Sequence, residues 1–307
     1  MPLKIIFLGS DSFAVPALSA LHTSPHEVSL CVTQPDRPQG RGRHIQPCPV
    51  RRCALELGIP TLTPEKIGDA VDALAAIRPD LAVVTAYGQY LPKAILAVPR
   101  FGFINIHPSL LPAYRGAAPM QWAIADGLAE TGVTIQQVVS RMDAGPVLAQ
   151  QTAPLLASET LVDVEPRLAA IGAAMLLDVI AQIEQGTAQP REQDESAVTW
   201  ARKLQKEDAR MDWTMPARTL HNRVRGFQPW PGTFAMLGEG RLRILRTQVE
   251  EGSGLPGAFL ERTGLGPLIA CGEGALRLIE VQPEGKRAMT GADFLRGSHL
   301  PDDARLV

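Results

Sequence analysis

Three polar side chains near the middle of the chain are of types that can act together on a reacting carbonyl group. Asn105 and His107 lie two residues apart in an apolar stretch, so on a β-strand their side chains leave the same face. The amide N–H of Asn105 and a protonated His107 can stabilise the oxyanion of a tetrahedral intermediate. Asp143, further along the chain, can keep the imidazole charged or relay a proton from an attacking amine. Such a set could transfer an acyl group to an amine without a Ser or Cys nucleophile.

The residues that follow His107 favour a loop directly after the polar side chains of Asn105 and His107. Pro108 and Pro112 prevent continued sheet pairing, and in α/β proteins active sites lie in the loops that follow strands. A structural interpretation fits the same residue types, with Asn105 and His107 capping a turn and Asp143 forming an Asx-turn. The residue types alone leave both interpretations open.

The segments that must position these side chains alternate between strand-like and helical patterns. This alternation predicts an α/β, Rossmann-like sheet that is mostly parallel, with helices on both faces. Two strand-like runs are separated only by residues 140–145, which indicates an antiparallel pair and therefore a mixed sheet. The strand-like runs are 3–8, 27–33, 60–62, 80–85, 102–106, 133–139 and 146–153, and the helical segments are 12–21, 51–57, 70–77, 118–125 and 161–183.

The pattern changes after a polar, non-periodic stretch at residues 191–206, which we interpret as a linker. Beyond it a short helix at 219–224 precedes regularly spaced short apolar runs between glycines, which favours a small OB-like β-barrel. We therefore predict a catalytic domain at 1–190 and an OB-like domain at 207–307. We expect Trp213, Phe227 and Trp230 to serve in packing. The apolar runs are 233–237, 242–247, 257–260, 268–271 and 275–281.

Length and composition are those of a globular protein with room for two domains: 307 residues, 45% of them apolar. The residues up to position 199 include 14 basic and 19 acidic ones, and the later residues 16 and 13. This asymmetry is typical of a polyanionic partner for the second part, although a difference of this size also arises by chance.

The four cysteines form no CxxC pair and lack the His spacing of zinc sites, so we expect no metal. The first residues read as a strand rather than a signal peptide. No run approaches the roughly 18 apolar residues of a membrane span. We therefore expect a cytoplasmic protein that does not enter a membrane.

Two ordered blocks of sequence resemble the hallmark of the 10-formyltetrahydrofolate-dependent formyltransferase family. The first block runs from Asn105 to Pro112 and on through residues 114–119, and the second comprises 131–134 and 142–146. The resemblance implies that Asn105, His107 and Asp143 are the catalytic trio, that 10-formyltetrahydrofolate is the co-substrate and that no metal takes part.

The same resemblance implies a folate pocket built from two loops. Because Tyr87 and Gly88 end a buried strand, backbone groups there could hydrogen-bond a flat pterin ring between apolar walls, although a plain strand-to-helix turn is the alternative. The implied folate-binding residues are Tyr87, Gly88, Gln89, Tyr90, Leu91, Ser109, Leu110, Leu111 and Pro112.

A formyltransferase core does not by itself name its acceptor. The loop at residues 36–44 carries three arginines among glycines and could follow an RNA backbone, while its charge alone fits a solvated surface loop equally well. The loop resembles the insertion that family members acting on initiator methionyl-tRNA place against the acceptor stem, and the C-terminal part resembles their barrel domain. The resemblance suggests tRNA contacts at Arg37, Arg41, Arg43, Lys203, Lys206, Arg223, Arg225, Lys286 and Arg287, each of which could also be a solvated charge.

The expected function is therefore transfer of a formyl group from 10-formyltetrahydrofolate to the α-amine of initiator methionyl-tRNA, for translation initiation, by a monomer. Three alternatives stay open. The same core could act on a small amine such as an amino sugar nucleotide, or it could be a hydrolase that releases formate from the folate. A non-catalytic RNA-binding protein on the same scaffold is the third, and the intact trio argues against it.

Overall fold

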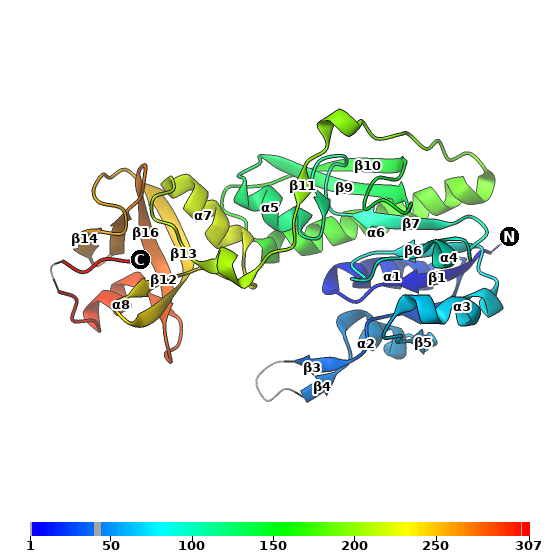
Figure 1. Ribbon diagram of the computed structural model, residues 1–307, viewed down its shortest axis with the longest axis horizontal. Helices are drawn as coiled ribbons and strands as arrows, with labels where there is room; N and C mark the ends of the chain where they lie inside the picture. The colour runs from blue at the N-terminus through cyan, green and yellow to red at the C-terminus, as the bar shows by residue number, and fades with distance from the viewer. Residues whose placement is uncertain (1, 40–43, 302) are drawn as a thin grey trace. The chain divides into compact units, whose positions relative to one another are not determined.

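A computed structural model describes residues 2–39, 44–301 and 303–307, and the chain forms two compact units (Figure 1). Unit 1 contains residues 1–116, 131–154 and 165–200, and unit 2 contains 117–130, 155–164 and 201–307. The boundaries predicted at residues 190 and 206 divide the chain differently, and they stay a prediction.

Unit 1 is built on one seven-stranded sheet with the strand order β10-β9-β7-β6-β1-β2-β5. The four pairs from β7 to β5 are parallel and β7 pairs with β9 antiparallel, which confirms the predicted mixed, mostly parallel sheet. Strand β6 is apolar throughout and β1 is apolar after Lys4, as is typical of central strands covered on both faces. The strands are β1 (Lys4–Leu8), β2 (Glu27–Val32), β5 (Thr61–Leu62), β6 (Leu81–Val84), β7 (Phe103–His107), β9 (Glu130–Gln137) and β10 (Val147–Pro154).

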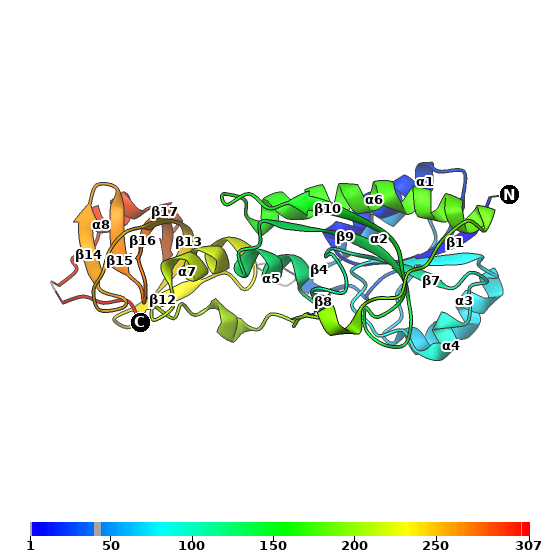
Figure 2. The ribbon, with the colours of Figure 1, turned by 90° about the horizontal axis from the view of Figure 1, so that it is seen from above.

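Helices cover both faces of this sheet. Figure 2 shows α1 and α6 on one side of it and α3 and α4 on the other. The covering elements are the 3₁₀ turn η1 (Ser12–Ala14), α1 (Val15–Thr23), α2 (Pro49–Glu56), η2 (Ile67–Ala70), α3 (Val71–Ile77), α4 (Lys93–Leu96) and α6 (Leu161–Gln185).

Helix α6 corrects the expectation that no apolar segment is long enough to cross a membrane. Among the described residues it is the one helix that could do so by length and composition, and 44% of its most apolar stretch is buried. Its Gly172 lies against β7 so closely that an added Cβ would be 2.6 Å from Ile106 Cγ2. A core helix that packs on a sheet passes the same test, so α6 is weak evidence for a membrane span.

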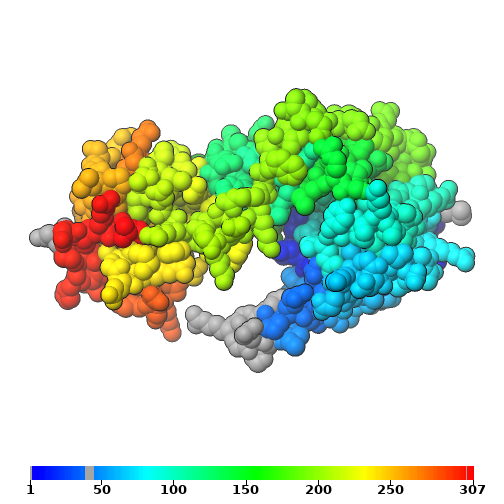
Figure 3. All heavy atoms as spheres, viewed as in Figure 1, coloured from blue at the N-terminus to red at the C-terminus, as the bar shows by residue number. Residues whose placement is uncertain are grey.

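The basic loop of unit 1 contains a short hairpin that the sequence did not predict. Strands β3 (Arg37–Gln39) and β4 (His44–Gln46) pair antiparallel, and Figure 1 shows them at the edge of unit 1 next to α2. The blue residues of this part of the chain lie at the surface of unit 1 in the space-filling view (Figure 3). An ion pair between Arg51 of α2 and Asp36 ties down the base of the hairpin. Arg37 is largely exposed and pairs with Glu65 at 3.5 Å. Arg41 and Arg43 lie outside the described residues.

Unit 2 contains a six-stranded sheet of the kind predicted for a small barrel. The five strand pairs of this sheet are all antiparallel, and the order is β12-β13-β16-β15-β14, with β17 on β16. The five predicted apolar runs fall on the first five strands, whereas β17 and α8 were not predicted. The elements are α5 (Pro119–Ala125), η4 (Lys206–Ala209), α7 (Ala217–Gly226), β12 (Phe234–Leu237), β13 (Gly240–Glu250), β14 (Phe259–Thr263), β15 (Gly266–Ala270), β16 (Ala275–Pro283), β17 (Met289–Thr290) and α8 (Gly291–Arg296).

The last residues of the chain connect the two edges of this sheet. Leu306 forms a bridge with Leu237 of β12, and Arg305 forms one with Ala258, which directly precedes β14. The backbone N–H of Leu306 donates to the Gly257 carbonyl at 2.9 Å. Because this tail satisfies backbone groups at both edge strands, the sheet is consistent with the predicted small barrel.

The aromatic residues of unit 2 behave as predicted at two of three positions. Trp213 and Phe227 are buried, and the Phe227 ring packs edge-on against Trp122 with 5.4 Å between centroids. Trp230 is 50% exposed, so the prediction that it serves in packing is wrong. It lies in a turn between two prolines at the end of α7, where the chain runs over the surface.

Candidate active site

The end of β7 presents Asn105 and His107 as the sequence predicted. Asn105 is half-buried and His107 is 4% exposed, while Ile104 and Ile106 between and before them are buried. Ile106 is held by α6 through Gly172, so the apolar residues anchor the strand and the polar ones share its other face.

The two ring nitrogens of His107 have different partners. Its Nε2 lies 2.9 Å from the Tyr114 carbonyl oxygen, and because a carbonyl only accepts, Nε2 carries a hydrogen. Its Nδ1 lies 3.8 Å from Asp143 Oδ1, which is beyond hydrogen-bond distance. Nδ1 is therefore the nitrogen that can serve a reacting group next to Asp143.

Asp143 has an unusual backbone conformation and a fixed carboxylate. Its φ of 48° lies in the left-handed region, which Asp tolerates better than most residues. The backbone N–H of Gly116 donates to Oδ2 at 2.8 Å, and Gln136 Nε2 donates to Oδ1 at 3.2 Å. Both bonds orient the carboxylate toward His107.

The sequence reasoning missed a set of side chains that support the Asp143 loop. Gln193 is buried, and its Nε2 donates to the carbonyls of Asp143 and Gly145 at 2.9 and 2.7 Å. Arg115, 1% exposed, donates to the Gln193 side chain. Gln193 lies in the segment that we predicted to be a linker. That segment has no apolar periodicity, so its sequence does not indicate that Gln193 is buried.

The loop after β7 is fixed by hydrogen bonds among its own groups and the neighbouring strand. Ser109 Oγ donates to the Ala113 carbonyl at 2.6 Å, and Thr134 Oγ1 accepts from the Leu111 N–H at 3.1 Å. Ser109 and Leu111 are buried, so they shape the proposed folate pocket, while Leu110 and Pro112 are half-buried and can border a ligand.

Two of the five implied folate residues after β6 face solvent. Gly88 is exposed with φ 86°, and Tyr90 is 64% exposed with its hydroxyl donating to the Ser140 carbonyl at 3.3 Å. Tyr87 and Leu91 are buried. The Gln89 side chain accepts from the Ile67 N–H at 2.8 Å, so it holds the loop in place.

Tyr87 departs from the expectation that its backbone would be free for a ligand. Its carbonyl accepts from Ser10 Oγ at 3.3 Å and from Gln34 Nε2 at 3.1 Å. Its hydroxyl is buried without a hydrogen-bond partner among the described residues, and burial raises its pKa to about 12. Tyr87 therefore joins three segments of unit 1.

The basic residues proposed for tRNA contact in unit 2 are not equally accessible. Lys203, Lys206, Lys286 and Arg287 are exposed and Arg223 is half-buried.

The burial of Arg225, which is 6% exposed, contradicts the prediction that it contacts a tRNA phosphate. Its guanidinium donates to Asn222 Oδ1 at 3.0 Å and to the Glu159 carbonyl at 3.0 Å, and burial lowers its pKa. It packs the inside of unit 2, so we remove it from the proposed tRNA-facing set.

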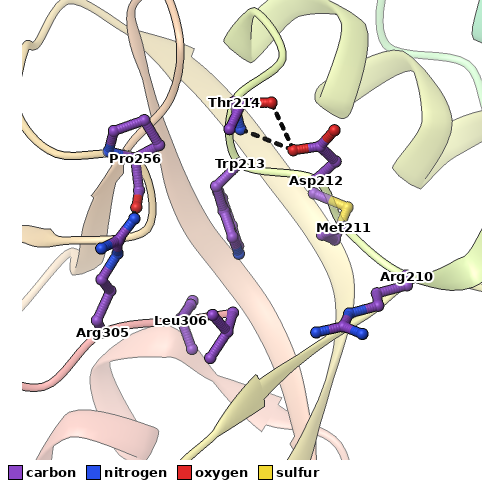
Figure 4. A pocket seen from close by; sticks show the side chains of 9 residues that line it. Arg210, Met211, Asp212, Trp213, Thr214, Pro256, Arg305 and Leu306 are labelled. Atoms are coloured by element: carbon purple, nitrogen blue, oxygen red, sulfur yellow. Dashed lines mark hydrogen bonds between the residues drawn. The ribbon is translucent and has the colours of Figure 1, made fainter.

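A separate cavity of about 330 Å³ lies wholly within unit 2 (Figure 4). Trp213 stands in its wall, and the Asp212 carboxylate beside it accepts hydrogen bonds from Thr214. Asn105, His107 and Asp143 belong to unit 1, so this cavity contains none of them. Within the described part of the chain, no group of three or more His, Cys, Asp or Glu residues could hold a metal ion.

The fold and the site together define a class of enzyme, and the chain belongs to the formyl transferase family. The family model described as "Formyl transferase" matches residues 3–180, and "Formyl transferase, C-terminal domain" matches residues 203–299.

Curated relatives are similar over nearly the whole chain. The methionyl-tRNA formyltransferase of Acidobacterium capsulatum is 43% identical and covers 99% of each chain. That of Pseudomonas fluorescens is 44% identical over 95% of this chain and 93% of its own. That of Roseiflexus sp. is 44% identical over 100% of this chain and 96% of its own.

Solved structures share the fold at lower identity. WlaRD, a sugar 3N-formyl transferase, superposes with a TM-score of 0.69 at 17% identity and covers 94% of this chain and 100% of its own. HypX from Aquifex aeolicus in complex with tetrahydrofolic acid gives a TM-score of 0.67 at 20% identity and covers 96% of this chain. This chain spans about half the length of HypX (47%).

Proposed function

We propose that this chain transfers the formyl group of 10-formyltetrahydrofolate to the α-amine of methionine on initiator tRNA. The observation that carries the proposal is the match of both units, over almost the full length, to proteins named methionyl-tRNA formyltransferase. The arrangement of Asn105, His107 and Asp143 supports the same reaction, since it supplies oxyanion stabilisation and a proton acceptor without a side-chain nucleophile.

The residues of the site have separate tasks in this reaction. As the amine attacks the formyl carbon, the Asn105 amide and the protonated Nδ1 of His107 stabilise the negative charge on the formyl oxygen. The Tyr114 carbonyl keeps His107 oriented through Nε2. Asp143, whose carboxylate is held 3.8 Å from Nδ1, accepts the amine proton directly or through water. That proton then goes to the folate nitrogen as its bond to the formyl carbon breaks.

The pocket for the folate co-substrate is formed by those residues of the two loops that are exposed or half-buried and can contact a ligand. Gly88 has no Cβ and Tyr90 is exposed next to it. Leu110 and Pro112 border the opposite loop, and no metal is needed for this chemistry. The buried residues Tyr87, Leu91, Ser109 and Leu111, together with the half-buried Gln89, position these two loops.

A labelled-formyl experiment tests the proposal. The protein is incubated with formyl-labelled 10-formyltetrahydrofolate and with charged initiator tRNA, charged elongator tRNA or free methionine. We expect label on the initiator methionyl-tRNA. Label on none of the acceptors, with formate released, would identify a hydrolase, and absence of any formyl turnover would identify a binding protein.

Substitutions in the trio test the mechanism. Loss of one oxyanion donor costs roughly 100- to 1,000-fold in kcat, and loss of a general base costs roughly 100- to 10,000-fold. His107→Asn and Asp143→Asn should therefore each lose at least about 100-fold in kcat while tRNA affinity stays within a factor of two to three. Near-normal turnover in either variant would refute the assigned roles.

Salt dependence separates an RNA acceptor from a small amine. If phosphates are bound, the affinity for tRNA falls with ionic strength by a power of roughly one per neutralised phosphate. Lys203→Gln combined with Lys206→Gln should reduce this slope, whereas Lys93→Gln, which changes an exposed lysine outside the proposed set, should not. A flat response would favour a small acceptor such as an amino sugar nucleotide.

The proposal includes a monomer in the cytoplasm. Light scattering after size-exclusion chromatography measures the oligomeric state, and a mass near 33.1 kDa is expected.

A further inference from the structure

The segment that the sequence predicted to be a linker begins with backbone pairing beside the catalytic loop. Arg191 and Val147 exchange two backbone hydrogen bonds of 2.7 and 2.9 Å, which places the following residues against the loop that carries Asp143. Gln193 points into unit 1 and is 9% exposed, an unusual position for a glutamine unless its amide is fully hydrogen-bonded.

The Gln193 amide group is hydrogen-bonded on both sides. Its Nε2 lies within hydrogen-bond distance of three oxygens, the Gly145 carbonyl at 2.7 Å, the Asp143 carbonyl at 2.9 Å and Gln136 Oε1 at 3.2 Å. Its Oε1 accepts from Nε and Nη2 of Arg115 at 3.0 and 2.8 Å. One side chain therefore connects a buried cation to both carbonyls that flank Ala144.

Arg115 determines which way the amides point. A guanidinium only donates, so the oxygen of Gln193 must face Arg115 and its nitrogen must face the loop. Gln136 then turns its oxygen to Gln193, which directs its own Nε2 at Asp143 Oδ1, 3.2 Å away. This assignment follows from the donors and acceptors, and it delivers an N–H to the catalytic carboxylate.

We propose that Gln193 is a positioning residue that holds Asp143 in its catalytic orientation, an inference that rests on the proposed function. Asp143 has a positive φ of 48°, a conformation that persists only where the surroundings enforce it. Gln193 enforces it through the carbonyls of Asp143 and Gly145, and through Gln136 it also orients the carboxylate toward His107 Nδ1.

Several charged side chains surround the Gln193 network. Arg115 also pairs with Glu195 at 2.9 Å, and Glu195 pairs with Arg141 at 2.6 Å. Hydrogen bonds from these two arginines lower the pKa of Glu195. Arg115 contacts Gln193 directly, Glu195 and Arg141 are connected to it through Arg115, and His107 faces Asp143. Because the Gln193 side chain lies 2.9 Å from the Asp143 carbonyl, a new negative charge at position 193 would be added close to Asp143.

Two substitutions of nearly equal size test the proposal. Gln193→Glu removes the N–H donors and adds a negative charge, whereas Gln193→Met removes the hydrogen bonds without a charge. Because a misplaced catalytic group costs on the order of 100-fold, we expect kcat to fall roughly 10- to 100-fold in both variants. The KM for 10-formyltetrahydrofolate and for methionyl-tRNA should change less than about 3-fold. Gln189→Glu, the same change at an exposed glutamine nearby, should leave kcat unaltered.

The pH profile distinguishes positioning from a merely structural role. In Gln193→Glu the added negative charge opposes the formation of further negative charge in the site, so the acidic limb of the kcat profile should move to higher pH. In Gln193→Met it should stay where it is in the unmodified protein. The melting temperature of each variant is measured alongside.

Two results would overturn the inference. One is a Gln193→Glu variant that is folded, with kcat within 2-fold of the unmodified protein and an unchanged pH profile. The other is a loss of kcat that only follows a lowered melting temperature in both variants. If Gln193→Glu does not fold, the kcat and KM of Gln193→Met decide. Failure of the unmodified protein to formylate methionyl-tRNA would instead refute the proposed function.

Discussion

Gly145 is the position at which one methyl group should do most damage to the catalytic loop. A Cβ built on Gly145 would lie 1.8 Å from the Gln137 carbonyl oxygen and 2.8 Å from its carbon, whereas real Cβ contacts essentially never fall under 3.0 Å. The obstacle is backbone, so the loop and the end of β9 must separate by more than an ångström. This separation lengthens the 2.9 Å bond from Gln137 N to the Pro146 carbonyl and the 2.7 Å bond from Gln193 Nε2 to the Gly145 carbonyl.

The expected loss for Gly145→Ala is about 3 kcal/mol in the free energy of unfolding. Overpacking contributes about 2 kcal/mol and two weakened hydrogen bonds about 1 kcal/mol each, less roughly 0.7 kcal/mol gained from the stiffer unfolded chain. Because Asp143 is two residues away, kcat should also fall on the order of 100-fold.

Urea unfolding followed by circular dichroism, with kcat measured on the same samples, tests this expectation. Gly264→Ala is the matched control, since no heavy atom lies within 4 Å of its added Cβ, and it should change stability by less than about 0.5 kcal/mol. A Gly145→Ala protein with stability and kcat both equal to those of Gly264→Ala would refute the reasoning.

Four further predictions follow from buried charges and thiols. Arg277, 4% exposed, donates to Glu250 and Glu261 at 2.7 Å each, so Arg277→Met should cost about 3 kcal/mol in urea unfolding; a change under 1 kcal/mol would contradict this. Since the bond from Arg277 lowers the pKa of Glu250, this carboxylate contributes stability above its unfolded pKa of about 4.3, and that stability is lost as the pH falls through the lower folded pKa. Glu250→Gln should therefore weaken the decline of stability at acidic pH, and an unaltered pH dependence would argue against the ion pair. Arg225→Ala should lower the free energy of unfolding by about 2 kcal/mol or more while the salt slope of tRNA binding stays constant, and a reduced slope would restore Arg225 as a phosphate contact. Burial raises the pKa of Cys31 and of Cys271 to about 12, so at pH 8 about one thiol in ten thousand is a thiolate; mass spectrometry after iodoacetamide treatment should find both unmodified in the native protein and modified in urea.

The local patterns of the sequence were sufficient to predict most of the fold. The strands of unit 1 and the five apolar runs of unit 2 could be predicted because buried strands need continuous or alternating apolar residues, and glycines mark their turns. The hairpin at 37–46 and helix α8 were missed. Both are too short to show a repeating apolar pattern, and the strand pair β3–β4 is tied to unit 1 by the ion pair between Asp36 and Arg51.

Residues distant in the sequence explain the failures at single positions. Arg225 looks like a surface arginine on a helix, yet the Glu159 carbonyl and the Asn222 side chain take up its donors. Trp230 looks like a core residue, yet it lies in an exposed turn. Burial of a polar group depends on whether partners are present, and the sequence does not show which partners the fold will bring.

The sequence by itself determined which atoms of Asn105, His107 and Asp143 can donate, accept or carry charge, because these properties depend only on the residue types. Only the tertiary structure decided how those atoms are used. In the folded chain, Nε2 of His107 donates to the Tyr114 carbonyl and Nδ1 lies beside Asp143. The tertiary structure also brought Gln193 from a segment that reads as a linker to hold the Asp143 loop. The physical reason is that the orientation of each polar side chain depends on its hydrogen-bond partners. Partners such as Gln193 are distant in the sequence, and local sequence patterns do not identify them.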